Sequence, residues 1–108
     1  MKKYRVFFVA EAEQDLLDIY NYVATYDSVG QAEALLQSLE MACYRLATFP
    51  RRGRIPPELE RIGVLEYRET FYKPYRIIYE IMREEVYIHG IFDGRRELQE
   101  LLQFRLLR

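Results

Sequence analysis

The chain has 108 residues, of which half are hydrophobic and 31% are charged, and this ordinary balance predicts one globular domain over residues 1–108. No run approaches the roughly 20 apolar residues of a membrane-spanning helix, so we expect no membrane partner. The single cysteine, Cys43, excludes an internal disulfide, and the single histidine, His89, leaves no cluster with metal-ligand spacing. We therefore expect a cytoplasmic protein without metal or cofactor.

The net charge of −1 conceals an uneven distribution along the chain. Residues 10–44 contain seven acids and no Lys or Arg, whereas residues 45–108 contain thirteen basic and ten acidic residues. An arrangement of this kind bears on the partners of a protein rather than on its fold.

The first predicted elements are a strand and two helices. Residues that favour β-structure fill Lys3–Val9, and from Glu11 the apolar residues recur every three or four positions, which predicts a helix. Ser28 with Gln31 fits a capping box for a second helix, whose regular apolar face ends near Phe49. Two helices joined by so few residues predict an antiparallel hairpin.

A long loop and three strands follow. Residues 51–63 have no hydrophobic period and include two glycines and two prolines, which predicts a loop with a helical turn at Pro57–Glu60. We expect strands at Leu65–Phe71, Tyr75–Met82 and Val86–Phe92, and a final helix at Arg96–Leu107. Short turns between successive strands predict antiparallel pairing. The predicted fold class is α+β, with an antiparallel sheet of about four strands, an N-terminal two-helix hairpin and a C-terminal helix.

One predicted strand, Tyr75–Met82, is apolar except for an arginine, Arg76, and a glutamate. Strand alternation places Arg76 on the second, mixed face, which we expect to be partly solvated and to include Arg68 of the preceding strand. An arginine on such a face can bind phosphate or carboxylate through two hydrogen bonds at once. The alternative is a cross-strand ion pair such as Arg68–Glu80 or Arg76–Glu66.

Further candidates for function are basic or titratable. His89 could serve as a general acid or base, although a structural role is the more common state of a lone histidine. Cys43 falls on the apolar face of the second helix, so we expect it in the core. The arginines expected to contact a target are Arg51, Arg52, Arg54, Arg68, Arg76, Arg95 and Arg96.

Four stretches of the sequence, in their order and spacing, resemble the ParE/RelE superfamily of bacterial toxins, the toxic halves of type II toxin–antitoxin pairs. They read EQDLLDIYNYV, QAEALLQSLEMACYRLATFPRRGR, YRETFYKPYRIIYEI and VYIHGIFDGRRELQELL. The resemblance covers residues 4–107 and implies the RelE/ParE-like fold, whose β-α-α-β-β-β-α order agrees with the elements above. It also implies a cognate antitoxin that folds on binding.

The resemblance also raises the possibility of an enzyme, because the superfamily includes enzymes. RelE-like members cut mRNA at the ribosome, using arginines on the sheet and commonly a histidine or tyrosine. Arg76 and Arg96 resemble two such arginines, so Arg76, His89 and Arg96 are the candidate catalytic residues of an RNase. However, Leu102 stands where these enzymes can carry a tyrosine, and His89 precedes the position of their histidine.

The longer helix hairpin, with its A-x-x-D-L-x-x-I pattern, more closely resembles the ParE-like members, which inhibit DNA gyrase and have no established hydrolytic site. We therefore favour a gyrase inhibitor and assign no catalytic residue. The alternatives are a RelE-like enzyme that acts on ribosome and mRNA, and an inactive member that serves only as an antitoxin-binding co-regulator. Both a homodimer and a hetero-oligomer with the antitoxin remain open.

Overall fold

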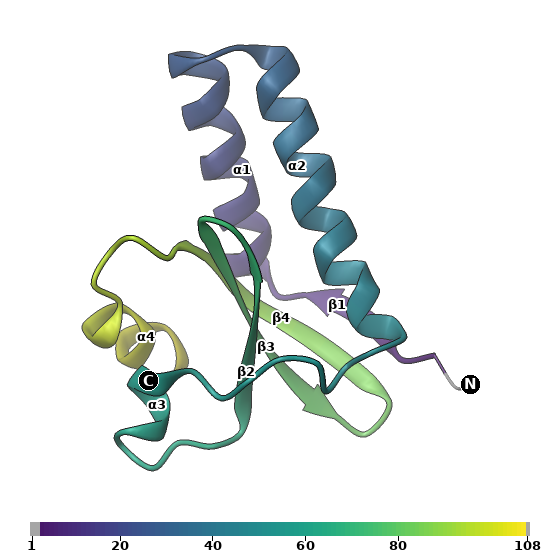
Figure 1. The fold of residues 1–108 in the computed structure, drawn as a ribbon, viewed down its shortest axis with the longest axis vertical. Helices are drawn as coiled ribbons and strands as arrows, with labels where there is room; N and C mark the ends of the chain where they lie inside the picture. The colour runs from purple at the N-terminus through teal and green to yellow at the C-terminus, as the bar shows by residue number, and fades with distance from the viewer. Residues whose placement is uncertain (1–2, 108) are drawn as a thin grey trace.

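The computed structural model describes residues 3–107 and contains a four-stranded sheet with helices on both of its faces (Figure 1). The order of elements is β1 (Arg5–Phe8), α1 (Ala10–Tyr26), α2 (Val29–Tyr44), a 3₁₀ turn η1 (Arg45–Ala47), α3 (Pro57–Glu60), β2 (Tyr67–Tyr72), β3 (Tyr75–Met82), β4 (Glu85–Asp93) and α4 (Gln99–Leu106). The predicted α+β fold is therefore confirmed. Within residues 3–107 no helix is both long and apolar enough to cross a bilayer.

The strands lie in the order β1-β4-β3-β2. The pairs β2–β3 and β3–β4 are antiparallel as predicted, but β1 runs parallel to β4, which makes the sheet mixed. Short turns dictate the direction of the three C-terminal strands only, whereas β1 reaches the sheet through the helix hairpin and is free to run either way.

The helix hairpin covers one face of the sheet and builds the larger core. Ser28 caps α2 as predicted, because its Oγ accepts a hydrogen bond from the Gln31 amide at 3.0 Å. Cys43 is buried in this core, in agreement with the sequence, and burial raises the pKa of its thiol to about 12. The buried side chains of this cluster are Ala12, Leu16, Leu39, Ala42, Cys43, Leu46, Ile77, Tyr79, Val86, Ile88 and Ile91.

The opposite face of the sheet is also covered, by α3 and α4. A second cluster of buried side chains forms there from Leu59, Tyr67, Ile78, Phe92, Leu98 and Leu102. Arg76 belongs to this face, and only 8% of its surface is exposed. The expectation of a partly solvated face was therefore wrong around Arg76, because α3 and α4 lie over it.

The register of β2 corrects a second expectation. Arg68 pairs with Tyr79, whereas Glu69 pairs with Ile78, so Glu69 and not Arg68 shares a face with Arg76. In addition, β4 has a bulge: Ile78 pairs with Gly90 and Tyr79 with Ile88. His89 is the extra residue between these pairs, so parity along β4 does not continue through it.

Candidate functional site

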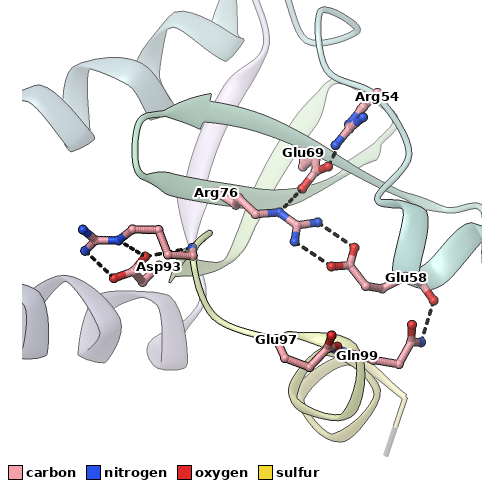
Figure 2. A network of polar contacts seen from close by, with 8 residues as sticks. Arg54, Glu58, Glu69, Arg76, Asp93, Glu97 and Gln99 are labelled. Carbon is pink, nitrogen blue, oxygen red and sulfur yellow. Dashed lines mark hydrogen bonds and ion pairs between the residues drawn. The ribbon is translucent and has the colours of Figure 1, made fainter.

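The buried guanidinium of Arg76 is held by two carboxylates (Figure 2). Its Nε donates to Glu69 Oε1 at 2.7 Å, and its two terminal nitrogens donate to Glu58 at 2.6 and 2.7 Å. Glu69 is fully buried. The ion-pair interpretation of Arg76 is therefore correct in kind, although its partners are Glu58 and Glu69 rather than Glu66. No ion pair within residues 3–107 joins Arg68 to Glu80.

The pairing extends beyond Arg76 into a network that joins five parts of the chain (Figure 2). Arg54 donates from Nε to the other carboxylate oxygen of Glu69 at 2.9 Å, and Gln99 of α4 donates to the backbone carbonyl of Glu58 at 2.8 Å. The network thereby connects β3 with β2, α3, α4 and the loop before α3. A charge inside an apolar strand is tolerated because every nitrogen of the Arg76 guanidinium has a carboxylate partner.

The partners Glu58 and Glu69 were not predicted from the sequence. The sequence indicated only that an arginine buried in an apolar strand needs carboxylate partners, and it did not indicate which ones. Glu69 could have been selected only with the correct strand register, and Glu58 lies 18 residues before Arg76 on another element. Neither position can be read from the local pattern.

The network predicts a specific dependence of stability on pH. Hydrogen bonds from Arg76 hold the pKa of Glu58 below its usual value of 4.5, against the opposing effect of burial. A lowered folded-state pKa stabilises the protein above the unfolded pKa, and this contribution is lost as the pH falls through the folded value. We expect urea midpoints to fall below about pH 4.5, and to fall less steeply in Glu58→Gln. Equal pH dependence in the two proteins would contradict this role of Glu58.

A loop over residues 50–54 is fixed to the sheet by a tyrosine from the core. The Tyr79 hydroxyl donates to the Pro50 carbonyl at 2.7 Å and accepts from the Gly53 amide at 3.1 Å. The next residue, Arg54, exchanges two backbone hydrogen bonds with Glu69, at 3.1 and 2.7 Å. Glycine is required at position 53, because an added Cβ would lie 2.3 Å from the Glu69 carbonyl oxygen.

This fixed loop and the neighbouring strand β2 present three arginines without carboxylate partners within residues 3–107, which we call the arginine cluster: Arg51 and Arg52 of the loop, and Arg68 of β2. The side chains of Arg51 and Arg52 are exposed and make no hydrogen bond or ion pair within residues 3–107. Arg68 donates to the Gly53 carbonyl at 2.9 Å and to no acid. All three charges act on the Tyr79 hydroxyl: burial raises its pKa, and the Gly53 amide and then Arg68, Arg52 and Arg51 oppose that rise.

The two other predicted arginines lie in a different segment, between β4 and α4 (Figure 1). Arg95 makes two hydrogen bonds to Asp93, at 3.0 and 2.7 Å, and they lower the pKa of that carboxyl to about 2. Arg96 is exposed, and its side chain has no partner in the described part of the chain. Both line a groove of about 450 Å³ beside α1. No hydrogen bond or ion pair within residues 3–107 joins them to the arginine cluster.

The candidate RNase residues are not brought into contact. His89, at the bulge, lies 3.0 Å from Glu80 through its Nε2 and stands edge-on to the Tyr67 ring, whereas Arg76 is bound in its own network. No hydrogen bond or ion pair links Arg76, His89 and Arg96 to one another within residues 3–107. In the same range, no group of three His, Cys, Asp or Glu residues is placed to hold a metal ion.

A family model and a curated relative indicate the same family. Residues 6–98 match the family model described as the ParE toxin of the type II toxin–antitoxin system parDE. The chain is 34% identical over 94 residues to Toxin ParE3 of Caulobacter vibrioides, which covers 87% of this chain and 90% of that protein.

Solved structures share the fold at low sequence identity. A chain from the chromosomal ParDE system of P. aeruginosa superposes with a TM-score of 0.71 at 17% identity, covering 84% of this chain and 96% of its own. A chain from the RelBE2 toxin–antitoxin complex of Mycobacterium tuberculosis gives 0.64 at 18% identity, covering 86% and 93%.

Proposed function

Because this chain belongs to the ParE toxin family of type II toxin–antitoxin systems, we propose that it inhibits DNA gyrase by binding and is neutralised by a cognate antitoxin. The choice of gyrase rather than ribosome-bound mRNA as the target rests on the environment of Arg76. This residue resembles a sheet arginine of the RNA-cleaving relatives. It is buried and bound to two carboxylates. Three of the five N–H donors of this guanidinium are bonded to Glu58 and Glu69, and the group is buried, so it is poorly placed to bind an RNA phosphate.

The remaining groups support binding rather than RNA cleavage. Cleavage requires one group to activate the ribose hydroxyl, one to protonate the leaving oxygen, and cations to hold the phosphate. His89 is the acid–base candidate on the sheet, but it is paired with Glu80. Leu102, at the position of a possible catalytic tyrosine, is fully buried in the core under α4. Acid–base groups contribute roughly 10²–10⁴-fold each, so an arrangement without them retains little activity.

An unpaired sheet edge supports the antitoxin as a partner. The outer strands of the sheet are β1 and β2. The middle of β2 is already paired with the backbone of Arg54, whereas β1 pairs within the sheet on one side only, with β4. An extended segment of an antitoxin can add a strand to such an edge and fold as it binds. We place the action of the protein in the cytoplasm, where gyrase and the antitoxin are synthesised.

The proposal predicts the outcome of two assays on the purified protein. We expect inhibition of gyrase supercoiling, reversed by the cognate antitoxin, and no cutting of mRNA on translating ribosomes as read by primer extension. Specific cuts in ribosome-bound mRNA with unaffected gyrase would instead support the RelE-like alternative. A protein that binds its antitoxin but is silent in both assays is the inactive co-regulator.

A further inference from the structure

Two members of the arginine cluster, Arg51 and Arg52, lie in a segment that has no acids of its own, and Arg68 reaches this segment from β2. Residues 41–57 contain four arginines and neither Asp nor Glu, whereas residues 10–40 contain all seven acids of the helix hairpin and no Lys or Arg. The nearest carboxylate on β2, that of Glu69, is buried and occupied by Arg54 and Arg76. The net charge of the protein is −1, so the whole molecule does not attract anions. A group of guanidiniums without carboxylate partners therefore favours a local anion-binding site.

The cluster is held in place before any ligand binds. One terminal nitrogen of Arg68 is fixed on the Gly53 carbonyl, which leaves the other donors of its guanidinium free. The loop that carries Arg51 and Arg52 is anchored at both ends by the Tyr79 hydroxyl. Donors on a fixed backbone lose less conformational freedom on binding than donors on a mobile loop.

The surroundings of the cluster indicate the class of anion. A hollow of about 550 Å³ is lined by Thr48, Phe49, Pro50, Arg51 and Arg52, and Phe49 is 55% exposed there. Planar guanidiniums match the oxygens of a phosphate, and an exposed aromatic ring beside them can lie against a sugar of the same backbone. A surface of cations with one aromatic ring therefore fits a nucleic acid better than a carboxylate-bearing protein.

We infer that the arginine cluster binds the phosphate backbone of duplex DNA. The inference rests on the proposed function, since gyrase acts on DNA and an inhibitor bound to the enzyme can lie against the duplex. The end of the helix hairpin at which α1 and α2 are joined projects beyond the sheet (Figure 1), and the acids of the hairpin are repelled by phosphates. The charge distribution thus favours an orientation with the cluster toward the DNA and the hairpin away from it.

Fluorescence anisotropy of a short labelled duplex tests the inference on the full chain. We expect dissociation constants of roughly 10⁻⁴–10⁻⁶ M, with the logarithm of affinity falling linearly with the logarithm of salt concentration. Arg51→Ala and Arg52→Ala, both at exposed positions, should each reduce the salt slope by about 0.9. The charge-matched control is Arg61→Ala, another exposed arginine, which follows α3 and should leave the affinity within about twofold of the wild type.

Three results would overturn the inference: no binding by the wild type at low salt, equal weakening in Arg61→Ala, or equally tight binding of a glutamate-rich peptide through the same arginines. The last result would assign the cluster to an acidic protein surface. The supercoiling assay separates this inference from the proposed function. Inhibition of gyrase without duplex binding removes only the inference, whereas duplex binding that depends on the cluster, with active gyrase, removes only the proposed function.

Discussion

The substitution Arg76→Ala is expected to lower the free energy of unfolding by about 3–5 kcal/mol, the usual cost of removing one partner from a buried ion pair. The reason is the fate of the carboxylates left behind. Glu69 is fully buried and would keep only Arg54, whose side chain is largely exposed. Glu58 would lose both of its hydrogen bonds to the guanidinium. This expectation replaces the initial hypothesis that Arg76 contacts a target.

Urea unfolding followed by circular dichroism measures the effect, and Arg96→Ala provides the matched control. Arg96 is also an arginine, but it is exposed and its side chain has no partner within residues 3–107. Its removal should change stability by less than about 0.5 kcal/mol. If the two variants unfold at the same urea concentration, the ion-pair network does not contribute to stability. That result would instead support a role of Arg76 in target binding.

A second large effect is expected for Leu102→Ala, at about 2–5 kcal/mol, the range for truncating a buried leucine. Leu102 is fully buried and packs in the cluster that includes Leu98 of the preceding segment and Phe92 of β4. A cavity at this point weakens the attachment of α4 to the sheet. We therefore expect faster amide hydrogen exchange in α4 than in α1, in addition to the loss of global stability.

The control for this substitution is Leu107→Ala, at the end of the same helix. Leu107 is 42% exposed, so its truncation removes less buried surface and leaves no enclosed cavity. A loss of stability in Leu107→Ala as large as in Leu102→Ala would show that α4 is held by its end rather than by its buried face.

The sequence was sufficient for the parts of the fold that depend on local patterns. The period of apolar residues in the hairpin, the cap at Ser28 and the helical turn at Pro57–Glu60 are all present in the structure. Each depends on residues a few positions apart, where spacing determines which side chains meet. The start of the last helix was less well placed: it begins at Gln99 rather than Arg96.

The candidate site was less predictable because it depends on register and on distant contacts. The pairing of Arg68 with Tyr79 places Arg68 on the face of the sheet opposite to the one expected. The bulge at His89 interrupts the alternation of side chains between the two faces along β4. A shift of one residue moves a side chain to the other face of a sheet, and the sequence contains no signal for it here. The carboxylates of Glu58 and Glu69 meet Arg76 only once α3 and β2 are in place.

The single hydroxyl of Tyr79 that holds both ends of the 50–54 loop restricts how this protein can evolve. An insertion or deletion between Pro50 and Gly53 would separate the two backbone groups that meet on that oxygen. The side chains of Arg51 and Arg52, in contrast, point to solvent and take no part in the anchoring. Descendants are therefore expected to keep a loop of constant length, with Tyr79 and Gly53 retained.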